Sequence, residues 1–321
     1  MIIVTGAAGF IGSVLLRKLN KEGISDIIIV DEAITPEKRP NIEGKKYKDF
    51  IEKEKFLALV TSDKLSGKTD AIFHMGASSS TTLTDEAYLK KNNVEYSQKL
   101  AEYALKKSAR FIYASSAATY GAGENGYSDE DETAYKLKPL NAYGRSKQEF
   151  DLWVLKKSLG DKVAGLKYFN VFGPNEYHKN DMRSVIAKSF DEVVKTKKMR
   201  LFKSHKKEYK DGGQKRDFIY VKDAVDATYY FLEARDKNGI YNIGTGRART
   251  WNDLALALFK ALGIPPKIEY FDIPEKLQDK YQYFTEADTA KLRRAGYKKD
   301  FTNLEEAIKE YAGFLKNKTY L

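Results

Sequence analysis

The first dozen residues restrict the possible folds of this chain more than any other stretch. The apolar run Ile2–Val4 predicts a buried strand, and apolar residues at spacings of three and four predict that a helix follows. Gly6, Gly9 and Gly12 lie between the two elements. These glycines let the backbone turn tightly and approach a pyrophosphate at the N-terminus of the helix. The chain is therefore expected to open with a βαβ unit of an α/β fold.

A second apolar run supports nucleotide binding by this unit. Ile27–Val30 predicts the next strand, which leads into Asp31, 19 residues after Gly12. An acidic residue at this distance can hold the adenosine ribose of a dinucleotide. Glu32 follows and adds a second negative charge. A purely structural βαβ unit that binds no nucleotide remains the alternative.

Small residues follow the third predicted strand. Ala71–His74 is an apolar run, and the segment Met75–Ser79 comes directly after it. The small side chains of this segment allow a cofactor to lie against the end of the strand. A long polar helix is expected at about residues 85–107. Asn92 on this helix either faces the cofactor or occupies a solvated position.

Three polar residues further along the chain suit the oxidation of an alcohol. Ser116 follows the predicted strand Phe111–Ala114, where a hydroxyl can hydrogen-bond a reacting alcohol or cap a turn. Tyr143 and Lys147 are four residues apart, which on a helix places both side chains on one face. A neighbouring ammonium is expected to lower the pKa of the tyrosine, which can then accept a proton while a hydride leaves carbon. The same spacing also occurs on solvated helices, so the three residues together carry the prediction.

The regular alternation of strands and helices loosens in the second half of the chain. Residues 1–172 are expected to form a Rossmann-type, doubly wound parallel sheet, with returns to it from about 217–243 and 280–292. Residues 173–321 are expected to form mainly a smaller, interleaved α/β domain that binds the substrate. A polar loop at 203–215 belongs to this part.

The composition argues against several classes of protein. No apolar run reaches the ~18 residues of a membrane span, and the first residues lack the basic region of a signal peptide, so we expect a cytoplasmic protein without membrane contact. The chain has no cysteine and three scattered histidines, so no metal site is expected. The formal net charge of +11 is spread along the chain. A solvated basic surface or a positive cleft for phosphorylated small molecules is expected, and not a nucleic-acid partner.

Several motifs together resemble one family of enzymes. The likeness is to the extended short-chain dehydrogenases/reductases of the NAD-dependent epimerase/dehydratase group, which act on nucleotide sugars, and it covers nearly the whole chain. Its main motifs are Gly6-x-x-Gly9-x-x-Gly12, Ser116, Tyr143-x-x-x-Lys147 and Arg216-Asp217-Phe218. Finer segments resemble the branch that epimerises an ADP-heptose at C6, namely Ser78–Thr82, Tyr113–Gly121, Tyr168–Pro174 with His178 and Lys179, Gly244–Ala248, and Lys280–Thr285 with Ala287 and Asp288.

This resemblance implies an epimerase that oxidises C6 of the heptose to a ketone and reduces it again on the opposite face, within lipopolysaccharide core biosynthesis. Tyr143 and Lys179 would be the two acid/base residues, Lys147 would position the nicotinamide ribose, and Ser116 would bind the reacting oxygen. The implied cofactor-binding residues are Gly6, Gly9, Phe10, Ile11, Gly12, Asp31, Glu32, Lys38, Lys53, Met75, Gly76, Ala77, Ser78, Ser79, Asn92, Tyr143, Lys147, Val171 and Lys179. The implied contacts to the nucleotide sugar are Ser116, Asn170, Asp181, Lys188, Leu201, Phe202, Lys203, Ser204, Arg216 and Tyr281.

The sequence departs from the family pattern at several positions. Met75 stands where Glu is usual, and Glu32 stands where Asn is usual. Asp181 and Lys188 stand where a serine and a histidine contact the substrate, and the loop at 203–215 is longer than expected. The reaction class is compatible with these changes, whereas the exact sugar is left open.

The choice between NADP and NAD depends on opposite charges. Asp31 favours NAD because it can hold the ribose hydroxyls, and Glu32 would repel a 2′-phosphate. Lys38 and Lys53, which the resemblance places at that phosphate, favour NADP. We predict NADP, with NAD as the alternative. The family forms rings, often pentamers, so the resemblance also implies a homo-oligomer.

Other functions fit parts of the sequence. A nucleotide-sugar 4-epimerase of the same superfamily needs Tyr143 but no second base. A dehydratase fits less well, because Ala117 and Ala118 follow Ser116 where an acidic pair is usual. A non-catalytic dinucleotide-binding regulator is the alternative from another class, and it would have no need to keep Ser116, Tyr143 and Lys147 together.

Overall fold

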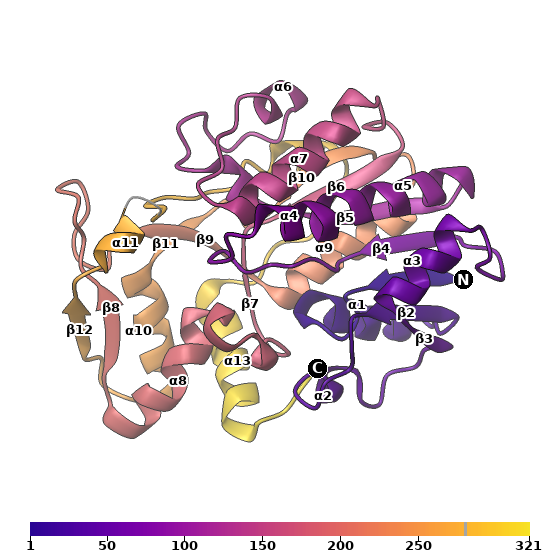
Figure 1. Cartoon of the computed structure of the whole chain (residues 1–321). Coiled ribbons are helices and arrows are strands. Elements are labelled where there is room, and N and C mark those ends of the chain that lie inside the picture. The colour runs from indigo at the N-terminus through magenta and orange to yellow at the C-terminus, as the bar shows by residue number, and fades with distance from the viewer. Residues whose placement is uncertain (279–280) are drawn as a thin grey trace.

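The structure, a computed structural model that describes residues 1–278 and 281–321, is built around a seven-stranded sheet with helices on both faces (Figure 1). All neighbouring strands in this sheet run parallel. From β1 the chain first adds strands on one side of the sheet, as β2 and β3, and then on the other side, beginning with β4, so the strand order reverses between β1 and β4. In spatial order the strands are β10 (Gly239–Ile243), β6 (Val163–Tyr168), β5 (Arg110–Ser116), β4 (Ala71–His74), β1 (Ile2–Thr5), β2 (Ile27–Asp31) and β3 (Asp49–Glu52).

Different helices cover the two faces of the sheet, because alternate residues of a buried strand point in opposite directions. Ile3 of β1 belongs to the core on one face, and Ile2 and Val4 belong to the core on the other. This three-layer arrangement confirms the predicted Rossmann-type α/β fold. The first face carries α3 (Lys53–Thr61), α5 (Tyr96–Lys106) and α7 (Ala142–Lys156), and the second carries α1 (Phe10–Lys21) and α9 (Val221–Glu233).

A second, smaller group of elements comes mainly from the later part of the chain. Between two of its strands the chain contributes α9 and β10 to the large sheet, so the two groups are interleaved in sequence. The domain boundary predicted at residue 172 remains a prediction. The group comprises a sheet of β7 (Asn170–Phe172), β9 (Lys215–Tyr220) and β11 (Ala248–Thr250), a parallel pair of β8 (Met199–Phe202) and β12 (Ile268–Phe271), and the helices α8 (Val185–Thr196), α10 (Trp251–Leu262) and α13 (Leu304–Asn317).

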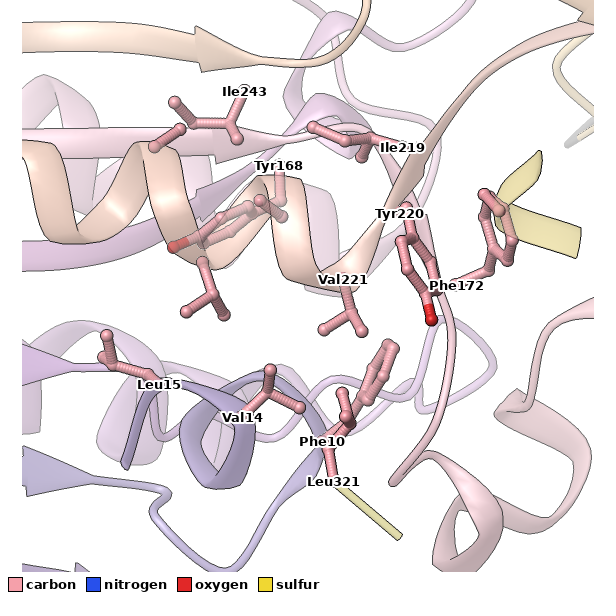
Figure 2. Close-up of a cluster of buried hydrophobic side chains, with 14 of the residues drawn as sticks. Phe10, Val14, Leu15, Tyr168, Phe172, Ile219, Tyr220, Val221, Ile243 and Leu321 are labelled. Carbon is pink, nitrogen blue, oxygen red and sulfur yellow. The ribbon is translucent and has the colours of Figure 1, made fainter. Parts of the chain in front are cut away.

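One hydrophobic core joins the large sheet to the second group. In Figure 2, Val14 and Leu15 of α1 point toward Tyr168 of β6 and Val221 of α9, and Phe172 of β7 belongs to the same cluster. Phe172 is 2% exposed and Val221 is 0% exposed. Burying a side chain of this size contributes about 1.5–3 kcal/mol to stability. The shared core therefore fixes the end of β6 and the start of β7 relative to α1, and the site described below lies there.

The helix expected at residues 85–107 differs from the prediction in its middle. It begins as α4 (Glu86–Leu89), where the side chain of Asp85 caps the helix by accepting a hydrogen bond from Tyr88 N at 2.9 Å. It continues as a π-helical segment, η1 (Lys90–Glu95), before it becomes α5. Such segments contain one extra residue in a turn and are frequent at functional sites.

Short elements complete the fold. None of the helices in the described part of the chain is both long and apolar enough to cross a membrane. The short elements are α2 (Arg39–Ile42), the 3₁₀ segments η2 (Ala117–Tyr120) and η3 (Tyr177–Met182), α6 (Asp131–Ala134), α11 (Glu275–Gln278) and α12 (Ala290–Arg294).

Candidate active site

A cavity of about 720 Å³ lies at the carboxyl ends of the central strands, where the strand succession reverses between β1 and β4. Open α/β sheets bind their ligands at this position. The glycine turn after β1, the ends of β4 and β5, the start of α7 and the segment around η3 all contribute to it. Of the predicted site residues, the cavity is lined by Gly6, Gly9, Phe10, Ile11, Gly12, Asp31, Glu32, Lys38, Lys53, Met75, Gly76, Ala77, Ser78, Ser79, Asn92, Ser116, Tyr143, Lys147, Asn170, Val171 and Lys179.

The turn after β1 needs glycine because of the chain's own contacts. Gly6 has a φ of +65°, and a Cβ there would lie 2.6 Å from Cα of Gly76 in the segment after β4. A Cβ at Gly12 would lie 2.1 Å from the carbonyl oxygen of Gly6. The two segments therefore meet backbone against backbone beside the cavity.

The N-terminus of α1 beside this turn is open to an anion. Among the described residues, no side chain caps this end of the helix, and its first turn contains no acid. The unpaired N–H groups and the positive end of the helix dipole suit a pyrophosphate. The turn and the helix therefore fit a bound dinucleotide.

Acidic and basic side chains pair with one another at the end of β2. The Asp31 carboxylate accepts a hydrogen bond from a backbone N–H of the glycine turn at 3.1 Å and forms an ion pair with Lys38 at 2.8 Å. Glu32 lies 3.6 Å from Nζ of Lys53, which also donates to the side chain of Asn92. Each predicted phosphate-binding lysine thus already faces an acid, so this end of the cavity is balanced in charge.

A buried asparagine that the sequence analysis did not identify fixes the segment after β4. Asn93 in η1 is 1% exposed. Its side chain accepts a hydrogen bond from Ser78 N and donates to Ser78 O, both at 2.9 Å, and it donates to Ser146 Oγ of α7 at 3.0 Å. The side chain of Asn93 therefore connects η1 to the segment after β4 and to α7. The only signal in the sequence is the pair Asn92-Asn93, and helical periodicity gives no reason to choose the second.

A chain of hydrogen bonds holds a neutral histidine next to the same segment. Gly76 N donates to Thr5 Oγ1 at 3.1 Å, and that hydroxyl lies 2.7 Å from Nδ1 of His74. On the other side, Nε2 of His74 lies 2.8 Å from Ser97 Oγ, which donates to the carbonyl of Asn93 at 2.7 Å. The ring therefore accepts at Nδ1 and carries its proton on Nε2. Burial lowers the pKa of His74 to about 3, so the ring stays neutral.

Local structure at the start of α7 brings three predicted residues to the cavity. Asn141 caps the helix by accepting a hydrogen bond from Gly144 N at 2.7 Å. A Cβ at Gly144 would lie 2.8 Å from a carbonyl oxygen of η2, so the helix packs closely on the segment after β5. This close approach places Tyr143 and Lys147 at the same cavity as Ser116.

Burial dominates the electrostatics of Tyr143 and Lys147. Burial raises the pKa of Tyr143, and a hydrogen bond with Ser116 offsets only part of this effect. Lys147 donates to the carbonyl of Ala114 at 2.7 Å, and burial lowers its pKa to about 8 although the charge of Asp151 acts in the opposite direction. The net direction is therefore opposite to the lowered pKa expected for Tyr143, because desolvation of the phenol outweighs its hydrogen bond with Ser116.

Lys179 reaches the same cavity from η3. Its Nζ lies 5.2 Å from the centre of the Phe10 ring, at the N-terminus of α1. Burial lowers the pKa of Lys179, and the charge of Glu176 offsets part of the change. A lysine with a lowered pKa exchanges its proton more readily near neutral pH. Two candidate proton-transfer residues, Tyr143 and Lys179, thus border one cavity.

Several predicted substrate contacts form an aromatic group next to the cavity and not in its lining. The guanidinium of Arg216, a residue that is 5% exposed, lies 5.3 Å from the ring of Tyr281 and 5.8 Å from that of Trp251. Trp251 itself lines the cavity. Phe202 packs edge-on against Tyr281 at 5.9 Å. Lys280, the first residue of one segment that carries the resemblance, lies outside the described residues.

The remaining predicted substrate contacts lie outside this lining as well. The side chain of Leu201 is 4% exposed and belongs to the hydrophobic core. It is buried because β8 turns alternate residues inward. Nζ of Lys203 and the backbone N–H of Ser204 each bond to an aspartate. Lys188 donates to the backbone carbonyl of Asp181 at 3.3 Å.

The fold, the glycine turn and the position of the cavity define the class of protein. The model of the NAD dependent epimerase/dehydratase family matches residues 2–244, and the chain belongs to this family. The family is NAD-dependent, so the dinucleotide that fits the turn is a nicotinamide cofactor.

More specific relatives are found within the family. The chain is 52% identical over 311 residues to ADP-L-glycero-D-manno-heptose-6-epimerase of Nitratidesulfovibrio vulgaris, with 97% of this chain and 96% of the relative covered. It is 46% identical over 320 residues to the enzyme of the same name from Fusobacterium nucleatum, with 97% and 96% covered. The crystal structure of Helicobacter pylori ADP-L-glycero-D-manno-heptose-6-epimerase superposes with a TM-score of 0.81 at 29% identity, covering 98% of this chain and 96% of that one.

Proposed function

We propose that this chain epimerises ADP-D-glycero-β-D-manno-heptose at C6 to ADP-L-glycero-β-D-manno-heptose, for the inner core of lipopolysaccharide. The observation that carries the proposal is that Tyr143 and Lys179 line one cavity beside a dinucleotide-binding turn. In the route proposed for C6, the sugar presents its oxygen to the protein in two orientations, and one proton-transfer residue serves each orientation. The relatives' names supply the identity of the sugar.

The chemistry at C6 determines what the residues must do. A bound nicotinamide supplies a hydride acceptor and donor, so that C6 passes through a ketone and is reduced on its other face. The protein has to move a proton at the C6 oxygen in each orientation. Tyr143, whose pKa burial raises, holds its proton and acts as the acid in one orientation. Lys179, whose pKa burial lowers, acts as the base in the other, and the two roles exchange in the reverse reaction.

The other polar residues bind and orient the reactants. We assign the reacting oxygen to Ser116 and the ribose next to the nicotinamide to Lys147, whose hydrogen bond to the end of β5 orients its ammonium. Asn170, which lines the cavity, would bind the sugar. The ADP group would bind toward Arg216 and Tyr281, because a guanidinium among aromatic rings suits a diphosphate and an adenine.

We assign NADP as the resident cofactor, with NAD as the alternative. The 2′-phosphate would replace Asp31 and Glu32 as the partner of Lys38 and Lys53. Denaturing the purified protein and identifying the released nucleotide by mass spectrometry tests this. Lys38→Ala is expected to reduce the bound NADP, whereas Lys21→Ala, at an exposed position near the end of α1, leaves it unchanged. Release of NAD alone, with Lys38→Ala harmless, contradicts the assignment.

Substitution of the two proton-transfer residues tests the reaction. Tyr143→Phe and Lys179→Met are each expected to lower the rate with ADP-heptose by about 10²–10⁴-fold while the dinucleotide stays bound. Lys195→Met, at an exposed position on α8, is the matched control. A wild-type rate in Lys179→Met would favour the 4-epimerase. A wild-type protein that binds dinucleotide and turns over no nucleotide sugar would favour the regulator.

An isotope experiment tests the route. Substrate that carries deuterium at C6 is expected to keep its label through many turnovers, because the hydrogen moves between C6 and one enclosed cofactor. Substrate that turns over in heavy water is expected to gain no deuterium at C6. Deuterium that appears at C5 or C7 would indicate enolisation and would require new roles for Tyr143 and Lys179.

We also propose that the chain acts in the cytoplasm as a homo-oligomer. The family resemblance supports a pentameric ring. Light scattering of the purified protein distinguishes a pentamer from a monomer.

A further inference from the structure

Glu176 is the acid buried most completely near Lys179. Its exposed fraction is 0%, and it occupies the N-cap position of η3, three residues before Lys179. Within the described residues, the hydrogen bonds that its carboxylate accepts come from uncharged groups. A buried charge is costly unless such contacts compensate it, so this carboxylate requires an explanation.

The donors that compensate Glu176 come from three parts of the fold. Gly173 N donates at 3.3 Å from the segment after β7, and Tyr311 OH donates at 3.0 Å from α13. Ser184, just before α8, donates twice, from its backbone N at 2.5 Å and from its hydroxyl at 2.6 Å. Both carboxylate oxygens are used. A glutamine at this position has one accepting oxygen, so only a carboxylate satisfies all of these donors.

The turn that Glu176 holds is strained on both sides of Lys179. Asn175 has a φ of +77°, and Asn180 has a φ of +47° with a ψ of −121°. Residues other than glycine keep such conformations only where surrounding contacts fix them, and they gather at functional sites. The carbonyl of Glu176 also accepts the backbone N–H of Lys179 at 3.0 Å. The strained turn and the buried carboxylate therefore form one unit.

We propose that Glu176 is the positioning residue for Lys179: its carboxylate keeps the turn in the strained conformation that brings the lysine ammonium to the cavity. This inference rests on the proposed role of Lys179 in proton transfer. Glu176 itself lies outside the cavity lining given by the described residues and has no role in contact with the substrate.

Glu176 also acts on Lys179 through its charge. Burial lowers the pKa of Lys179, and the negative charge of Glu176 opposes this change. The other titratable groups that line this part of the cavity are His178 on the same turn, Tyr143 from α7, Arg183 before α8, and Asp31 with Lys38 from the end of β2 and the segment after it. Burial lowers the pKa of His178 to about 4, so its ring is neutral at working pH. Glu176 is therefore the acid that keeps burial from lowering the pKa of Lys179 further.

The test is Glu176→Gln in the full-length protein with its cofactor bound, assayed with ADP-heptose over a range of pH. We expect kcat to fall by about 10²-fold with little change in KM, because a small misplacement of a reacting group has this effect. The limb of the kcat profile that reports Lys179 is expected to move to lower pH, because the opposing charge is gone. Glu176→Asp, which keeps the charge, is expected to restore the position of the limb.

Milder variants keep the test decisive if Glu176→Gln does not fold. Ser184→Ala and Tyr311→Phe each remove one donor and retain the charge. They are expected to lower kcat by smaller factors without moving the pH limb. Glu306→Gln, at an exposed position on the same α13, is the matched control and is expected to change nothing. Wild-type kcat in both donor variants would overturn the inference.

The outcomes also separate this inference from the proposed function. If the wild-type protein does not epimerise ADP-heptose, the proposed function fails. If Lys179→Met is inactive while Glu176→Gln keeps the wild-type kcat and pH limb, only the positioning role fails. A Glu176→Gln protein with a lower denaturation midpoint but unchanged kcat and pH limb would show a purely structural residue and would also overturn the inference.

Discussion

The ion pair between Asp151 and Lys167 gives a quantitative test of how the structure behind the cavity is stabilised. The two groups are 2.8 Å apart, and their side chains are 0% and 2% exposed. Asp151 also accepts hydrogen bonds from Tyr113 OH at 3.0 Å and Ser115 Oγ at 2.7 Å. Lys167 also donates to Thr119 Oγ1 at 2.8 Å. The pair thus links α7, β5, β6 and η2 behind the cavity.

Removing one partner leaves the other charge buried and uncompensated. Asp151→Asn and Lys167→Met should each lower the free energy of unfolding by about 3–5 kcal/mol. The double variant removes both charges, so its loss should be smaller than the sum of the two single losses by about 3 kcal/mol, at the upper end of the coupling between contacting residues. The activity should also respond, because the charge of Asp151 opposes the effect of burial on the pKa of Lys147.

Urea denaturation followed by tryptophan fluorescence measures these free energies. Trp153 stacks on Phe150 at 5.5 Å on the same helix as Asp151 and reports its unfolding. The exposed pair Lys106 and Asp63, 3.0 Å apart, is the control, and Lys106→Met should have no measurable effect. Single variants as stable as the wild type, or losses that simply add in the double variant, would refute the reasoning.

The remaining predictions concern single residues. The ring nitrogens of His74 should show a neutral Nε2–H tautomer by NMR down to pH 4, and titration near its ordinary pKa would contradict the assignment. In the unfolded chain His74 takes up a proton near pH 6.5, whereas in the folded protein it does so only near pH 3. Lowering the pH between these values should therefore decrease the free energy of unfolding. Urea denaturation at several pH values measures this decrease. Gly12→Ala should abolish dinucleotide binding, measured by the nucleotide released on denaturation, because its Cβ would lie 2.1 Å from the carbonyl oxygen of Gly6. Gly313→Ala, in an exposed turn of α13 with free space around it, should raise the free energy of unfolding by about 0.5–1 kcal/mol, and a loss of stability would contradict this.

The sequence predicts those features that depend on local pattern. The strand and glycine turn at Ile2–Gly12 and the helix that carries Tyr143 and Lys147 each have a periodicity or spacing that specifies them. Their meeting at one cavity follows from the rule that parallel strands end at a common edge. These features determine most of the fold and the lining of the cavity.

The features that the sequence does not reveal are buried polar contacts between distant segments. Asn93, Glu176 and Asp151 look like ordinary helical or loop residues, and only the folded chain shows which donors surround them. The electrostatics of Tyr143 are a further case. Its spacing from Lys147 suggests a lowered pKa, but desolvation depends on packing that spacing does not encode.

The π-helical segment η1 has a consequence for how this helix tolerates length changes. Because a π turn holds one residue more than an α turn, deletion of a single residue from Lys90–Glu95 would convert the stretch to a regular helix. The regular helix on either side would keep its orientation, and only the side chains within the turn would change direction. Asn93 lies within this turn, so it would lose its direction toward Ser78 although α5 keeps its packing on the sheet. The shortened helix would thus be regular, but Asn93 would no longer fix the segment after β4. A related sequence with a one-residue gap at this place would therefore belong to a protein that holds this segment through other contacts.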